Sequence, residues 1–355
     1  MRADKALRVS SLYFTSPRST AQGKTCCLLQ RVLPILFLFL ACDLPCAKAT
    51  TVWLDTDCSI GSPFREVDDA FAILLAFRSS ELRIAGISTT YGNASLGRTT
   101  AVTRDLVRRF GGPASDRNPK VHPGARSRQD LGLETVATRA LAEALRENRS
   151  VVYVALGPLT NLATFEMLHP ELASRIQRVI FVGGTTENAS LRFGSRHPIR
   201  IHDANVFKDP EAVRRVLQAK VPVTLVPIAT SSQIMLNEQD LKEIGRNSEA
   251  GDYLRKNSVL WLWFWTNFVG TEGGPVFDAA AVVAAMDPSL LEFETGFAVV
   301  NAPGDLLVSK NSMPHSQRVL FCPRLAVSAR QFVRQKLGAR ARIESQPQKS
   351  GRRQP

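Results

Sequence analysis

Four aspartates are concentrated in one short stretch of the sequence, Leu54–Phe71 (LDTDCSIGSPFREVDDAF). Asp55 and Asp57 follow an apolar run, and Asp68 and Asp69 open the next apolar segment. Neighbouring carboxylates that are removed from water do not all stay ionised unless a positive charge offsets them. A hard divalent cation such as Ca²⁺, which binds several oxygen ligands at once, provides that charge. The stretch therefore points to a divalent-cation site.

Two other interpretations of the stretch are open at this point. Negative charge is favoured at the start of a helix, so Asp68 and Asp69 are also compatible with simple helix capping. Capping leaves Asp55 and Asp57 unexplained. Their D-x-D spacing resembles the first-strand motif of haloacid-dehalogenase-type phosphoryl transferases, although the partner motifs of that class are not evident. Without a His/Cys cluster or a C-x-x-C pair, the sequence gives no support for zinc.

The elements that must position these residues alternate along the chain. Continuous apolar runs, which are typical of strands buried on both faces, are separated by segments with helical periodicity. We expect strands at 51–55, 82–93, 150–158, 176–184 and 221–229, and helices at 68–77, 96–112, 135–148, 159–168, 209–219 and 276–286. This order predicts an α/β fold, an open and mostly parallel sheet flanked by helices in a single domain. Ligands bind such sheets beyond the carboxyl ends of the strands, which is where the acids fall.

The composition is that of a globular protein with basic ends. Of 355 residues, 44% are hydrophobic and 22% charged, and the formal net charge is +13. Residues 1–49 contain the apolar run Val32–Ala41 and end in Ala-Lys-Ala, which predicts a signal or targeting segment and a periplasmic or secreted protein. Residues 50–328 form the predicted catalytic domain. Residues 329–355 are strongly basic and are predicted to be a disordered, solvated tail.

These ends limit the partners that we expect. The basic tail lacks interleaved aromatic residues, so no nucleic acid is expected, although binding of a polyanion by the tail stays open as an alternative. The apolar run is too short for a stable membrane span. If the first 49 residues are removed, Cys58 and Cys322 remain, either as one disulfide or as two buried thiols.

Six sequence blocks fall into an order that resembles one known family. They are the D-x-D strand end with the following DDAFAILLAF, GISTTYGNAS at 86–95, VALGPLTNLA at 154–163, FVGG at 181–184, DANVFKDPEA at 203–212 and VFDAAAVVAAMDP at 276–288. Each block alone is modest, but the ordered set resembles the inosine–uridine-preferring nucleoside hydrolases over roughly residues 51–300. The resemblance implies Ca²⁺-dependent hydrolysis of the N-glycosidic bond of a small-molecule ribonucleoside, giving ribose and free base. Because members of the family are commonly dimers or tetramers, it also allows a homo-oligomer.

The resemblance assigns roles to particular residues. Asp57, Asp69, Asp278 and the backbone carbonyl of Leu156 would ligate the metal ion, and Asp57 would also be the general base. The metal ion would hold a water molecule and the ribose 2′- and 3′-hydroxyls. These residue types suit glycosidic cleavage, because carboxylates stabilise the positive charge of an oxocarbenium-like transition state.

A second set is expected to contact the substrate. By the same resemblance, Asp68 and Asn93 would hydrogen-bond the ribose hydroxyls or the water molecule. Asp203 and Asn205 stand where the family usually has Glu-x-Asn, which holds the hydroxyls of the sugar. Asp55 would support the site from behind.

The sequence departs from the family pattern at three places. Asp68 comes eleven residues after Asp57, because residues 58–67 form a long insertion at the mouth of the site. Phe277 replaces the histidine that helps the leaving base depart in many members. Asp203 replaces the usual glutamate. The departure at Phe277 keeps a second hypothesis open, a catalytically weak or inactive protein that binds nucleosides or ribosyl groups on the same fold.

Overall fold

The computed structural model describes residues 49–63, 65–111, 118–186, 192–197, 199–200 and 203–339. The predicted targeting segment lies outside these residues apart from Ala49, so export of the protein stays a prediction. Residues 340–355 of the basic tail also lie outside them. In the described part of the chain, no helix is long and apolar enough to cross a membrane.

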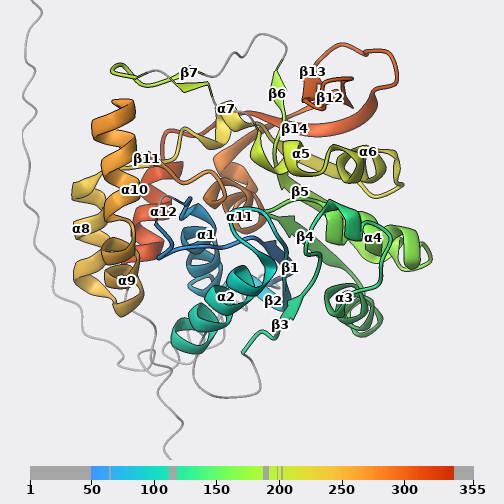
Figure 1. The fold of residues 1–355 in the computed structure, drawn as a ribbon, viewed down its shortest axis with the longest axis horizontal. Helices are drawn as coiled ribbons and strands as arrows, with labels where there is room; N and C mark the ends of the chain where they lie inside the picture. The colour runs from blue at the N-terminus through green and yellow to red at the C-terminus, as the bar shows by residue number, and fades with distance from the viewer. Residues whose placement is uncertain are drawn as a thin grey trace, which may run out of the picture. The chain divides into compact units, whose positions relative to one another are not determined.

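Within the described ranges, ten strands form one sheet in the order β3-β2-β1-β4-β5-β9-β14-β12-β13-β6 (Figure 1). Their bounds are β1 Thr50–Thr56, β2 Leu82–Thr89, β3 Val121–Pro123, β4 Val151–Ala155, β5 Ile176–Val182, β6 Thr185–Thr186, β9 Val223–Val226, β12 Leu291–Val300, β13 Leu306–Ser309 and β14 Gln317–Leu325. Two short two-stranded pairs lie apart from it, β7 Arg192–Phe193 with β8 Ile199–Arg200, and β10 Met235–Leu236 with β11 Gly274–Pro275.

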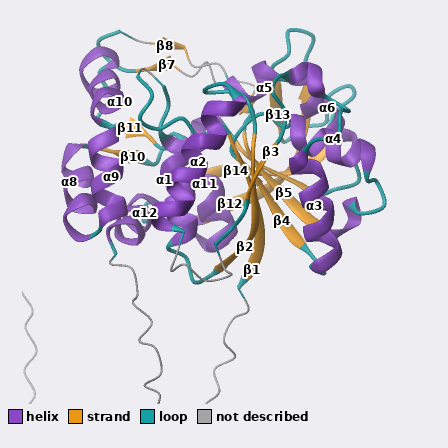
Figure 2. Ribbon diagram, turned by 60° about the horizontal axis from the view of Figure 1, so that its bottom comes forward, coloured by secondary structure: helices purple, strands orange, loops and turns teal. Residues whose placement is uncertain are grey.

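Helices flank both faces of the sheet, as Figure 2 shows. Their bounds are α1 Asp68–Phe77, α2 Leu96–Phe110, α3 Val136–Glu147, α4 Thr160–Leu168, α5 Ala204–Lys208, α6 Pro210–Gln218, α7 Ile228–Ser231, α8 Glu238–Asn247, α9 Glu249–Asn257, α10 Val259–Trp263, α11 Ala279–Met286 and α12 Ala329–Gly338. A π-helix, η3 Phe264–Val269, continues α10, and short 3₁₀ turns occupy η1 Arg128–Asp130, η2 Ala173–Arg175 and η4 Pro288–Leu290.

Alternating side chains of the central strands build two hydrophobic cores. Val52 and Leu54 of β1 pack with α1 and α11 on one face, while Trp53 packs with α3 and α4 on the other. The predicted α/β architecture with a mostly parallel sheet is therefore confirmed, and its continuously apolar strands are explained by burial on both faces.

The strands of the C-terminal part of the sheet are not predicted from the sequence. β12 pairs antiparallel with both β13 and β14, and β14 joins β9 in parallel. The predicted elements ended with the helix at 276–286 and contained none of these three strands. They extend the sheet beyond β9, away from the carboxylates of the first strand.

The boundary of the basic tail at residue 329 is corrected by α12. This helix places Ala329, Val333 and Leu337 in the core, and their spacing of four residues is that of one helix face. On another face, Arg330 and Arg334 form ion pairs with the buried Asp240 at 2.5 and 3.1 Å. Two charges of the apparent basic run thus stabilise the fold.

The strand order places the acids at a favoured position for a ligand site. β1 lies between β2 and β4, and it pairs in parallel with both. The chain continues from β1 to β2 on one side of the sheet, whereas β4 begins the run β4-β5-β9 on the other. The carboxyl end of β1 is therefore a topological switch point, where a crevice between diverging connections is expected.

Glu166 in α4 provides a test of the packing away from these strand ends. Burial raises the pKa of Glu166 to about 8. Neither of its carboxylate oxygens has a hydrogen-bond partner in the described part of the chain. Because the pKa in the folded state lies above the ordinary value of 4.5, the contribution of Glu166 to stability is lost as the pH rises from that value through about 8.

We expect Glu166→Gln to melt at nearly the same temperature as the wild-type protein at pH 4.5 and several degrees higher at pH 9. Thermal melts at both pH values test this expectation. Glu171→Gln, which changes a largely exposed carboxylate just after α4, is the control. A melting difference that does not depend on pH would show that the ionised carboxylate is not the cause.

Candidate active site

The end of β1 is tied to the start of α1 by hydrogen bonds to Asp69. The backbone N–H of Asp57 donates to Asp69 Oδ1 at 3.1 Å, and the hydroxyl of Thr56 donates to the same oxygen. The residue that caps α1 is Val67, which makes no side-chain capping hydrogen bond. Helix capping by Asp68 or Asp69 therefore does not explain the acids, and the long insertion still returns both to the strand end.

Three buried carboxylates can present oxygen atoms that all lie within 4.8 Å of one another. They belong to Asp68, Asp69 and Asp278, and each side chain is at most 6% exposed. Asp278 precedes α11 and makes no capping hydrogen bond with it. Burial, followed by repulsion from neighbouring carboxylates, raises the pKa of all three well above the usual range. For Asp68, the first of these neighbours is Glu66. Added positive charge would reverse this effect, so the donor set fits a hard divalent cation.

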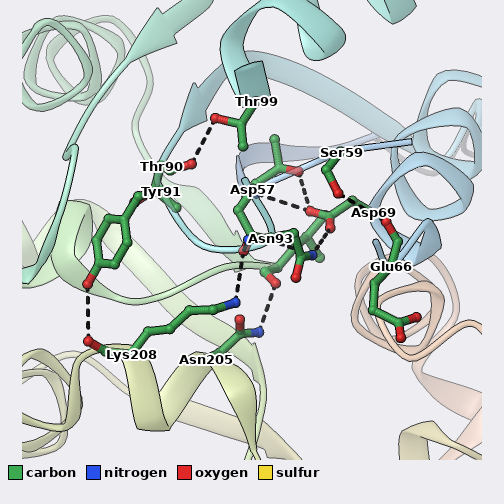
Figure 3. Close-up of polar contacts among 12 residues, drawn as sticks. Asp57, Ser59, Glu66, Asp69, Thr90, Tyr91, Asn93, Thr99, Asn205 and Lys208 are labelled. Atoms are coloured by element: carbon green, nitrogen blue, oxygen red, sulfur yellow. Dashed lines mark hydrogen bonds and ion pairs between the residues drawn. The ribbon is translucent and has the colours of Figure 1, made fainter. Parts of the chain in front are cut away.

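Asp57 lies beside Asp69 and has partners of its own (Figure 3). Its Oδ2 accepts a hydrogen bond from the backbone N–H of Asn93 at 2.6 Å, and Asn93 Nδ2 donates to Asp57 Oδ1 at 3.3 Å and to Asp69 Oδ2 at 3.2 Å. This approach requires Gly92, whose φ is 155° and where a Cβ atom would lie 1.7 Å from Asp57 Oδ2. Burial raises the pKa of Asp57, and Lys208 opposes that rise.

The short helix α5 brings two further side chains to the site (Figure 3). Lys208 Nζ lies 3.4 Å from Asp57 Oδ2, and Asn205 Nδ2 donates to the carbonyl oxygen of Leu156 at 2.9 Å. Asp203 caps the helix, accepting from the backbone N–H of Val206 at 3.1 Å with one oxygen. Its other oxygen accepts from the N–H of Gly184 at 2.6 Å, after β5.

The Asp55 side chain lies on the face of the sheet that is covered by α4, away from the carboxylate group. Its Oδ1 accepts hydrogen bonds from Ser88 at 2.6 Å and from Asn161 Nδ2 at 2.8 Å. Asn161 Oδ1 in turn accepts from the backbone N–H of Ala125 at 2.8 Å. Burial raises the pKa of Asp55 to about 6. The side chain thus links β1, β2 and α4 at the base of the site.

The insertion meets an aromatic-rich segment, formed by α10 and η3, at the edge of the acid group. Glu66 Oε2 accepts a hydrogen bond from Trp261 Nε1 at 2.7 Å, which ties the insertion to α10. Phe277 packs edge-on against Trp265 and Phe193. Of the aromatic residues in this segment, Trp261 and Trp265 are buried, whereas Trp263 is exposed. The segment therefore contributes both to the core and to the surroundings of Phe277.

The structure brings most of the predicted site residues to one place. Asp57, Asp69 and Asn93 are joined by hydrogen bonds, and Asn205 contacts Leu156. Two residues lie differently from their predicted roles. Asp68, which was predicted to contact the substrate, falls in the three-carboxylate group, whereas Asp57, which was predicted to ligate the metal ion, lies outside it. Asp203 directs both oxygens to backbone N–H groups, so its visible role is to position α5.

Sequence reasoning missed two charged residues beside the acids. Lys208 lies three residues after Asn205, and this spacing places both on one face of a helix, a signal that was available in the DANVFKDPEA block. Glu66 precedes Asp68 by two residues, but its position depends on the hydrogen bond with Trp261, almost 200 residues away. No local pattern indicates that contact.

The fold and the site define an α/β protein with a buried group of carboxylates, able to hold a metal ion, near the carboxyl end of β1. A family model described as inosine-uridine preferring nucleoside hydrolase matches residues 52–325. The chain belongs to this family, and it is a ribonucleoside N-glycosyl hydrolase by that membership.

Individual relatives agree with this assignment. Uridine nucleosidase 1 of Arabidopsis thaliana is 28% identical over 265 residues, which cover 67% of this chain and 76% of that protein. The probable ribonucleoside hydrolase of Dictyostelium discoideum is 26% identical over 281 residues, 68% of this chain and 78% of that protein. The solved structure of a plant nucleoside hydrolase superimposes with a TM-score of 0.69 at 24% identity, covering 82% of this chain and 99% of that one. The structural likeness supports the fold.

Proposed function

We propose that this protein hydrolyses the N-glycosidic bond of ribonucleosides with the help of a bound Ca²⁺ ion. The observation that carries the proposal is the group of three buried carboxylates, Asp68, Asp69 and Asp278, beside Asp57 at the end of β1. The pKa values of all three carboxyl groups are raised, so the neighbouring side chains in the described part of the chain do not offset their negative charge. Oxygen donors alone suit Ca²⁺ better than a softer metal.

Asp69 and Asp278 would hold the cation, with Asp57 and the Leu156 carbonyl completing the predicted ligand set. Asp68 belongs to the same group and would either ligate the cation or bind a ribose hydroxyl. When bound, the cation would lower the pKa of a water molecule and fix the vicinal hydroxyls of ribose.

The chain's own residues would then perform three tasks. Asp57 would accept the proton of the attacking water, because it is buried beside the proposed cation site and oriented by the backbone N–H of Asn93. Asn93 and Asn205 would position the sugar with their amides. The surrounding carboxylates would stabilise the positive charge that develops on the sugar ring.

A second function is favoured by one observation, the aromatic side chain at position 277. Phe277 offers no proton to a leaving base, and it packs against Phe193 and Trp265. A protein that binds nucleosides but turns them over slowly would keep the acid group and this aromatic cluster. The two functions differ in turnover, since both require the acid group.

A panel of nucleosides separates the two functions. Uridine and inosine are the first substrates to test, because relatives are named for uridine and the family for both. We expect the purified protein to release ribose and free base from at least one of them. A protein that binds nucleosides, measured by calorimetry, but releases no ribose from any member of the panel would support the binding function.

A further inference from the structure

Lys208 is unusually placed for a site that is expected to hold a cation. In the described part of the chain, it is the only basic residue that forms an ion pair with the acids around Asp57. Its Nζ lies 3.4 Å from Asp57 Oδ2, and the backbone N–H of Asp57 donates to Asp69, so the ammonium group lies beside the buried acids. An ammonium group thus already supplies part of the positive charge that the acid group requires.

The ammonium group and a divalent cation would compete for the same carboxylate. Asp57 Oδ2 already accepts from the backbone of Asn93 at 2.6 Å, and Lys208 Nζ lies 3.4 Å from the same oxygen. A cation that ligates Asp57 would stand within a few ångströms of the ammonium group and repel it. The partly buried position weakens screening by water, so the repulsion remains significant.

A cavity next to Lys208 can accommodate its ammonium group when that group leaves Asp57. Its backbone carbonyl lies 3.3 Å from the Tyr91 hydroxyl, which donates to it. The residue lines a cavity of about 410 Å³ together with Tyr91, Arg128 and Phe207. Phe207 is 74% exposed, so the cavity lies at the surface. A lysine stem is long and flexible, and its ammonium is strongly hydrated in such a place.

We propose that Lys208 is a built-in competitor of the divalent cation, which pairs with Asp57 in the cation-free protein and is displaced toward this surface cavity when the cation binds. The inference rests on the cation requirement proposed above. It gives Lys208 two effects of opposite sign, because the residue stabilises the cation-free protein and weakens cation binding. The hydrolase would therefore tolerate loss of its cation better than an acid group without a lysine.

The test compares Lys208→Met with the wild-type protein by titration calorimetry with CaCl₂ alone at pH 8. We expect the variant to bind Ca²⁺ about tenfold more tightly, since removing a unit charge at this distance in a partly buried site has an effect of that order. In chelator, the variant should melt at a lower temperature than the wild-type protein, and saturating Ca²⁺ should close the gap.

Two further variants separate charge from structure. Lys208→Arg keeps the charge and should keep the affinity within about threefold of wild type. Lys242→Met removes an equal charge from an exposed pair with Glu238 on α8 and should leave the affinity unchanged. Equal or weaker Ca²⁺ binding by Lys208→Met would overturn the inference.

The titration of the wild-type protein distinguishes this inference from the proposed function. Absence of Ca²⁺ binding by both the wild-type protein and Lys208→Met would contradict the cation requirement itself and, with it, the role of Lys208. Binding by Lys208→Met alone would support the competitor role in its strongest form. Binding by both with equal affinity would leave the cation requirement in place and reject the competitor role.

Discussion

Asp57→Asn is expected to reduce kcat/KM for ribonucleoside hydrolysis by about a thousandfold while the protein stays folded. Asparagine has nearly the same shape as aspartate, and one of its two polar atoms can still accept the hydrogen bond of the Asn93 N–H. It cannot accept the proton of the attacking water. It also lacks the charge that pairs with Lys208 and faces the proposed cation.

Steady-state kinetics and circular dichroism of the purified variant measure both parts of this expectation. Asp305→Asn, which neutralises an exposed carboxylate in the loop between β12 and β13, is the matched control and should keep full activity. Activity of Asp57→Asn within tenfold of the wild-type protein would assign the general base to another residue.

Asp278→Asn is expected to remove cation binding and, at the same time, to stabilise the cation-free protein. The side chain is 3% exposed and lies against two other carboxylates. It makes no capping hydrogen bond with α11, so the amide loses no such partner. Removing one of three crowded charges relieves repulsion, and we expect a gain of about 1 kcal/mol or more in the free energy of unfolding in chelator at pH 8.

In the wild-type protein, saturating Ca²⁺ should add roughly 2–3 kcal/mol at a cation concentration about a hundred times the Kd. In Asp278→Asn this increment should disappear. Denaturant unfolding in chelator and in Ca²⁺ measures both terms, with Asp305→Asn again as the control. A variant that is less stable than the wild-type protein in chelator would argue that Asp278 is held by protein contacts rather than crowded by its neighbours.

The parallel half of the fold could be predicted from the sequence, because its signals are local. The continuously apolar strand at Val52–Leu54 and the helix that opens with Asp68 were both predicted close to their observed bounds. The carboxyl ends of parallel strands meet at one edge, so a site at the end of β1 followed from the order of elements, whereas the roles of Asn93 and Leu156 came from the family resemblance.

The remaining features depend on contacts between distant parts of the chain. α12 was mistaken for a disordered tail because the partner of Arg330 and Arg334 is Asp240, about ninety residues earlier. The ion pair between Lys208 and Asp57 spans 151 residues. Such pairs have no signature in the local sequence, whereas helical spacing within α5 did contain a hint of the position of Lys208.

We propose that the buried acid group makes ribonucleoside hydrolysis depend on a divalent cation. The most direct test strips the purified protein of divalent cations and follows ribose release from uridine and inosine as Ca²⁺ is added. We predict no release in chelator and a rise in release over the same Ca²⁺ range in which calorimetry detects binding. Release at full rate in chelator, from protein shown to be free of metal, would contradict the account.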